Sequence, residues 1–175
     1  MNYVYAEGST KLKRSIAEQV VRFCIDELMP RMRTLEIDVI LNNKLESHQY
    51  GYCCAIDTRE FELEVNANLS LSKLVTTICH EMVHVMQYAR KTLDITNQSD
   101  HSTYDEYMDL WYEVEARKFE KILTKKFVVP SAFFPHVLLW RGALGVGLKI
   151  VFEQIEYIIL QSPSYTVRTY HDSLI

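Results

Sequence analysis

The chain has 175 residues, of which 48% are hydrophobic and 24% are charged, a balance that is ordinary for a globular protein. Its formal net charge of −4 provides no overall positive field, so we expect no nucleic acid as the main partner. A chain of this length buries a sizeable core without disulfide bonds.

The first residues, MNYVYAEGSTKLKR, contain no apolar run of the length that a secretory signal requires. The four cysteines, at positions 24, 53, 54 and 79, include no pair with CxxC spacing. These two observations predict a cytoplasmic protein with reduced thiols and no cysteine-based zinc site. On a helix Cys79 would point about 100° away from its neighbour His80, so we expect it in the core.

Hydrophobic periodicity predicts one helix and three strands in the first part of the chain. The helix has Ser9 or Thr10 as its N-cap and Pro30 just beyond its end. LEIDVIL alternates apolar and acidic residues, as a half-buried strand does, and two later strands are separated by the turn residues Asp57–Glu60. The predicted ranges are 11–29 for the helix and 35–41, 50–56 and 61–65 for the strands.

A second helix is predicted from Ser70 or Ser72 to Lys91, and it is apolar on most of its circumference. Such a helix is expected at the centre of a fold. A polar loop over 92–102 and a further helix over 103–126 follow.

The last part of the chain begins with FVVPSAFFPHVLLW, residues 127–140, which contains no Lys, Arg, Asp or Glu but two prolines. A membrane span needs about 20 mostly apolar residues without such breaks, so we expect none here. We predict instead that this segment and a helix over 147–160 cover the core. The whole chain would then be one domain, with its core in residues 11–126 and a covering segment in 127–175.

The stretch ICHEMVHVMQ places His80 and His84 four residues apart, hence on one face of the central helix. Two imidazoles so placed can bind one zinc ion. Glu81 is rotated by about 100° from His80 and can act as a general base toward a water molecule. The spacing HExxH is a known metalloprotease signature.

Metal binding would explain why two histidines stand in an apolar helix, where unpaired polar groups are costly. The alternative is a pair of hydrogen-bonded core histidines with a surface glutamate. A catalytic zinc site also needs a third protein ligand. Glu113 and Glu115 on the next helix and the earlier His101 are candidates, and helical phase does not choose between the two glutamates.

HEMVH followed by a helix with EVEA resembles the zincin metallopeptidases of the gluzincin type. The resemblance implies that Glu113, the first glutamate of EVEA, is the third ligand. Relatives of this kind often have Asn or Asp four residues later, where this chain has Arg117, so the partner of the ligands is not identified. The order of elements also resembles the compact SprT-like and ImmA-like minimal zincins. His101, followed by Ser-Thr-Tyr, matches the third histidine of SprT-like proteins poorly.

The resemblance implies an α+β fold of the minimal zincin type, with a small, mostly antiparallel sheet packed on the HExxH helix and flanked by helices. It implies a Zn2+-dependent peptidase acting on a peptide or protein substrate, with Glu81 as the base. Substrate would bind along the sheet edge provided by the 50–65 hairpin. An oxyanion donor is needed too, and four tyrosines near the motif remain open: Tyr88, Tyr104, Tyr107 and Tyr112.

Two other readings of the sequence stay open. The chain could be a non-catalytic zinc-binding regulatory or interaction module on a zincin fold, or a structural protein without metal. We expect surface or packing roles for His48, His136 and His171. The acidic strand positions Glu36/Asp38 and Glu62/Glu64 are expected to be solvated, although they could favour basic substrates.

Overall fold

The computed structural model describes residues 1–45, 49–93 and 103–127. The chain divides into two units, Met1–Phe127 and Val128–Ile175, and all described residues belong to the first. The predicted loop over 92–102 therefore lies outside the described residues from residue 94 on, the predicted segment 127–140 does so from residue 128 on, and the predicted helix over 147–160 does so entirely. The predictions for His48, His101, His136 and His171 also lie outside the described residues.

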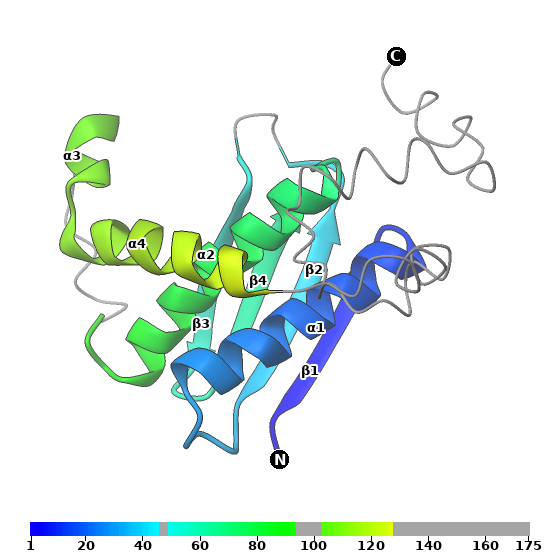
Figure 1. Ribbon diagram of the computed structural model, residues 1–175, viewed down its shortest axis with the longest axis horizontal. Coiled ribbons are helices and arrows are strands. Elements are labelled where there is room, and N and C mark those ends of the chain that lie inside the picture. The colour runs from blue at the N-terminus through cyan, green and yellow to red at the C-terminus, as the bar shows by residue number, and fades with distance from the viewer. Residues whose placement is uncertain (46–48, 94–102, 128–175) are drawn as a thin grey trace, which may run out of the picture. The chain divides into compact units, whose positions relative to one another are not determined.

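Strands and helices are mixed along the described chain, which confirms the predicted α+β class (Figure 1). In order, the elements are β1 (Tyr3–Gly8), α1 (Lys11–Leu28), β2 (Glu36–Asn42), β3 (Gly51–Asp57), β4 (Glu60–Asn66), α2 (Leu71–Ala89), α3 (Tyr104–Met108) and α4 (Trp111–Lys126).

The four strands form one sheet in the order β1-β2-β4-β3. β1 and β4 both run parallel to β2, and only β3 is antiparallel to its neighbour β4. The predicted mostly antiparallel sheet was therefore wrong. The error has a topological cause: α1 is the crossover between the parallel strands β1 and β2, and β3 lies at the edge, so that β2 pairs with β4 instead.

Strand β1 was not predicted, because its alternation is hidden in the sequence. Val4 and Ala6 are buried, while two of the three exposed positions that alternate with them are tyrosines, and only Glu7 is charged. Gly8 ends the strand with a φ of 76°, and a Cβ there would lie 2.2 Å from the carbonyl oxygen of Leu41. Glycine is therefore required for the turn into α1.

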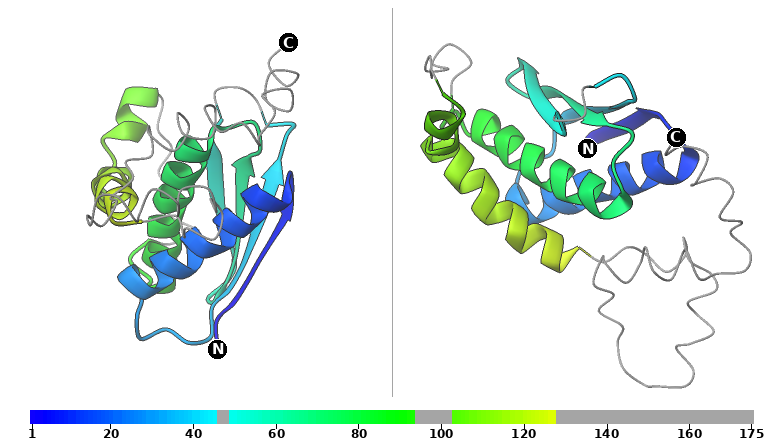
Figure 2. Two further views of the ribbon diagram at one scale, coloured as in Figure 1. Left: turned by 45° about the vertical axis from the view of Figure 1, so that its right-hand side comes forward. Right: turned by 90° about the horizontal axis from the view of Figure 1, so that it is seen from above.

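The hydrophobic core lies between the sheet and the helices α1 and α2, which cover the same face of the sheet (Figure 2). β2 and β4 contribute their alternate residues to it, as their alternating sequences predicted. The largest fully buried side chains of the two strands are Ile37, Phe61 and Leu63. No described element covers the opposite face of the sheet.

Helix α2 is central, as predicted: most of its residues are buried, and it contacts α1, α4, β3 and β4. The hydroxyl oxygen of Ser70 accepts a hydrogen bond from the backbone N–H of Lys73 and caps its start. Thr10 caps α1 in the same way. Within the described ranges, no helix has both the length and the apolar composition to cross a membrane.

The single helix predicted over 103–126 is interrupted at Asp109 and Leu110, which separate α3 from α4. The guanidinium of Arg117 holds this break, because it donates a hydrogen bond to the carbonyl oxygen of Met108 and contacts the sulfur of the same residue at 2.8 Å. The residue that departs from the zincin pattern thus fixes the turn that brings α3 back over the start of α4.

Candidate metal centre

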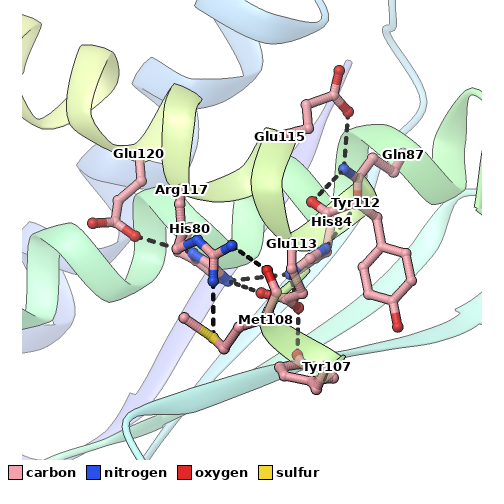
Figure 3. A network of polar contacts seen from close by, with 10 residues as sticks. All are labelled: His80, His84, Gln87, Tyr107, Met108, Tyr112, Glu113, Glu115, Arg117 and Glu120. Carbon is pink, nitrogen blue, oxygen red and sulfur yellow. Dashed lines mark hydrogen bonds and ion pairs between the residues drawn. The ribbon is translucent and has the colours of Figure 1, made fainter. Parts of the chain in front are cut away.

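His80, His84 and Glu113 meet where α2 packs against the first turn of α4 (Figure 3). The two Nε2 atoms of the histidines are 3.2 Å apart. The Glu113 carboxylate presents Oε2 to Nε2 of His80 at 3.4 Å and Oε1 to Nε2 of His84 at 3.2 Å. Glu113 follows His84 by 29 residues and His80 by 33, so the packing of the two helices brings together three atoms that can bind a metal.

These separations suit a tetrahedral metal. Zinc–ligand bonds of about 2.0–2.1 Å at tetrahedral angles place ligand atoms about 3.4 Å apart. The three measured values, 3.2, 3.4 and 3.2 Å, are close to that spacing. Two imidazole nitrogens and one carboxylate also form a ligand set that zinc accepts in catalytic sites.

Gln87 fixes the tautomer of His84. Its side-chain nitrogen donates hydrogen bonds to the carbonyl oxygen of Tyr112 at 3.0 Å and to Glu115 at 2.9 Å, so its oxygen must be the atom that faces His84 Nδ1 at 2.8 Å. Nδ1 of His84 therefore carries a proton and donates it to this oxygen. Nε2 keeps its lone pair toward His80 and Glu113, as a metal ligand must.

Glu120 orients His80 in a similar way. Its carboxylate accepts a hydrogen bond from Nδ1 of His80 at 3.0 Å. Glu120 lies two helical turns after Glu113 on α4, so both carboxylates face α2. Carboxylate–histidine contacts of this kind orient the ring and make its other nitrogen more basic.

The electrostatics of the cluster keep Glu113 charged. Burial alone would raise its pKa, but the close contacts with the His80 and His84 rings and the hydrogen bond from Tyr107 hold the pKa well below its ordinary range. Its place in the first turn of α4 also favours a negative charge. Burial alone would lower the pKa of His80, but its hydrogen bonds to Glu113 and Glu120 raise it to about 10. In the protein without metal, the His80 ring is therefore protonated at neutral pH.

Glu81 belongs to this region but not to the ligand cluster. It is 6% exposed, and no hydrogen bond joins its carboxylate to another described residue. Burial raises its pKa above the ordinary value, although attraction to His84 and His80 partly offsets the effect. Its charge also acts on Cys53 of β3, where burial and then Glu81 raise the pKa of the thiol. A buried carboxylate with a raised pKa has the properties of a general base.

The structure separates the two glutamates that the sequence could not. Glu113 points into the cluster, whereas Glu115 points away from it and accepts a hydrogen bond from Gln87 (Figure 3). Among the four candidate tyrosines, Tyr107 donates a hydrogen bond to Glu113. Tyr104 is 73% exposed, and Tyr112 packs its ring edge-on against His84.

Sequence reasoning missed two residues of the site, Gln87 and Glu120. Gln87 is 0% exposed, a rare situation for an amide in an apolar helix, and it lies one turn after His84. Glu120 has the same phase on α4 as Glu113. The signals that could have identified them are the polar side chain of Gln87 in the apolar helix α2 and the helical phase of Glu120 on α4.

Comparison with known proteins adds no relative: no protein-family model, curated protein or solved structure matches this chain.

Proposed function

We propose that the chain is a zinc-dependent metallopeptidase of the zincin type, with His80, His84 and Glu113 as ligands and Glu81 as the general base. One observation supports this most strongly. Two imidazoles and a carboxylate present their free ligand atoms to one another at tetrahedral spacing, while each Nδ1 is occupied by a protein partner. Fixed tautomers of this kind are typical of metal-binding histidines.

Zinc held by three protein ligands leaves one position for water and lowers the pKa of that water to about 7. Glu81 would accept the proton of the attacking water on its carboxylate and pass it to the nitrogen of the leaving amine. Its raised pKa favours both steps, because a base with a pKa nearer to neutral both takes up and returns a proton readily.

The edge of the sheet supports a peptide substrate. β3 is an edge strand next to α2, so the backbone N–H and C=O groups on its outer side can pair with an extended peptide. The packing of β3 on α2 is close, since a Cβ at Gly51 would lie 2.9 Å from Cγ2 of Thr77 on α2. A peptide paired with β3 would run beside the helix that carries Glu81.

Tyr107 is the tyrosine that we favour as the oxyanion donor. Its hydroxyl contacts the Glu113 carboxylate, so it lies at the ligand cluster. Burial, followed by the hydrogen bond to Glu113, raises the pKa of Tyr107 far above its ordinary value, which keeps the hydroxyl protonated as a donor must be.

The test combines metal content with cleavage. Purified protein should contain about one zinc per chain, as one three-ligand site implies, measured by elemental analysis. Glu113→Gln should lose that zinc, and Glu115→Gln, the matched control on the same helix, should retain it. Zinc absent from the wild type and not taken up on titration would refute the proposal.

Cleavage is measured with a mixed peptide library and mass spectrometry. Glu81→Gln should retain zinc but lose activity by a factor of about 10²–10⁴, the usual contribution of a general base. Full zinc and undiminished cleavage in Glu81→Gln would remove Glu81 from this role. If the zinc-loaded wild type cleaves no member of the library, the non-catalytic zinc module becomes the better description.

A further inference from the structure

The face of the sheet that no described helix covers is acidic and aromatic. None of the four strands contains a lysine or an arginine. The strand positions that alternate with the core positions carry six carboxylates on this face: Glu7, Glu36, Asp38, Glu60, Glu62 and Glu64. This concentration of charge exceeds what the net charge of −4 for the whole chain would suggest.

The register brings these carboxylates together in rows across the strands. Tyr5, Asp38 and Glu62 are in register on β1, β2 and β4. Tyr3, Glu36 and Glu60 form the next row in the same way. Neighbouring strands lie about 4.8 Å apart, and like charges directly opposite each other destabilise a sheet. Each row thus places two negative charges side by side next to one tyrosine.

Nothing in the described chain neutralises these pairs. No described lysine or arginine forms an ion pair with any of the six carboxylates. One carboxylate oxygen, Oδ1 of Asp38, is buried and has no hydrogen-bond partner. A buried acceptor without a donor is costly, so Asp38 adds to the unfavourable free energy of this face.

The same face also carries exposed tyrosine rings beside its carboxylates. Tyr3 and Tyr5 are 53% and 46% exposed, and on the opposite edge strand Tyr52 is 41% exposed. Exposed aromatic rings beside carboxylates suit long cationic side chains, because the alkyl part packs on the ring while the charged head pairs with the acid.

We propose that this face is a docking surface for a Lys/Arg-rich polypeptide segment. Charge complementarity selects that partner. The same charges repel nucleic acids and anionic lipid surfaces, and they repel the same face of a second copy. The surface lies on the side of the sheet away from α2 and its histidines, so the inference stands independently of the proposed peptidase activity (Figure 2).

The test uses a fluorescein-labelled peptide of alternating lysine and serine, with a glutamate–serine peptide as the negative probe. Fluorescence anisotropy with the full chain should show binding of the lysine peptide alone, weakening as salt is added. The double substitution Asp38→Asn with Glu62→Gln should raise its Kd at least about tenfold, a change of about 1.4 kcal/mol. Asp26→Asn with Glu27→Gln on α1, the control with an equal charge change, should alter Kd by less than about twofold, since these exposed residues lie outside the face.

An equal effect of both double substitutions would show general attraction and overturn the proposal. So would calcium that binds the wild type but not Asp38→Asn/Glu62→Gln while the peptide fails to bind, because the face would then be a cation site. Circular dichroism should show an unchanged or higher Tm for that variant, since a repulsive pair is removed. Should it fail to fold, Glu36→Gln with Glu60→Gln in the next row tests the same prediction, and unchanged peptide affinity there would contradict it.

Discussion

At the scale of single residues, the geometry of the candidate metal centre depends on groups outside the three proposed ligands. Each histidine uses Nδ1 for a protein partner, Glu120 for His80 and Gln87 for His84, and this leaves Nε2 free for a ligand. Gln87 in turn is held by the Tyr112 carbonyl and by Glu115. Glu115, which the sequence offered as a ligand, therefore acts on the centre only through Gln87 and His84.

Glu120→Ala should weaken zinc binding about 10- to 100-fold, the usual cost of removing a partner of a metal-bound histidine. Competition with a chromogenic chelator measures the change. Glu115→Ala is the control: because Gln87 keeps its bond to the Tyr112 carbonyl, we expect a change of less than about threefold. An equal loss of zinc affinity in both variants would contradict the greater importance of the Glu120–His80 contact.

The protonation of His80 gives a second prediction. Its pKa is about 10 in the protein without metal, against an ordinary value of 6.5. Because the folded state holds the extra proton, the contribution of this interaction to stability is fully present below pH 6.5 and is lost as the pH rises through about 10. Zinc competes with the same proton, so its apparent affinity should rise across this pH range.

Proton NMR of the histidine ring in zinc-free protein measures this titration directly. The midpoint for His80 should lie well above 8, and Glu120→Gln should lower it by removing one of the two carboxylate partners. A midpoint near the ordinary value in the wild type would contradict the prediction.

The residues of the site differ in how far the sequence could identify them. HExxH spacing alone specified His80, Glu81 and His84, because four residues bring side chains to the same helix face. Glu113 was selected only by resemblance, since α4 presents Glu113 and Glu115 on flanks of one face. Gln87 and Glu120 depend on how α2 and α4 pack, and that is set by contacts distant in sequence.

At the scale of elements, the tight packing of β3 on α2 gives a further prediction. Replacing glycine by alanine inside a strand is usually favourable by about 0.5–1 kcal/mol. At Gly51 the added Cβ would meet the Glu64 carbonyl oxygen and Thr77 Cγ2 at 2.9 Å, so Gly51→Ala should instead destabilise the fold by about 1–3 kcal/mol. Urea unfolding measures this, and stabilisation would contradict the proximity of β3 and α2.

Periodicity identified most elements of the described chain to within a few residues, but their arrangement was harder to predict. The hydrophobic periodicity of the strands β2 and β4 and of the amphipathic helix α1 is evident in the sequence. β1 hides it, because tyrosine is tolerated on both faces, and without β1 the parallel pairing through α1 could not be anticipated. The break between α3 and α4 depends on Arg117 reaching back to Met108, a contact that periodicity does not encode.

At the scale of the whole molecule, zinc would join α2 to α4 across the segment between them. A ligand that binds only the folded state stabilises it by about 4 kcal/mol at a concentration 1,000 times its Kd. Calorimetry should therefore show a Tm that rises with zinc and falls with a chelator. His84→Ala should abolish the zinc-dependent part, because one of the three ligands is lost. An equal shift in His84→Ala would indicate binding elsewhere.

Cys24 and Cys79 are both 0% exposed, and their sulfur atoms lie 3.9 Å apart where α1 packs on α2. Their hydrogen bond and then burial hold the pKa of Cys24 well above its ordinary value, so the folded protein offers an alkylating reagent almost no thiolate there. Either thiol can be labelled only when the two helices separate, so the labelling rate measures how often this local opening occurs. Peptide mapping by mass spectrometry separates these two thiols from Cys53 and Cys54. Zinc bound by His80, the residue after Cys79, should lower the alkylation rate of the two thiols. A rate that does not depend on zinc would mean that this turn of α2 opens without releasing His80 from the metal.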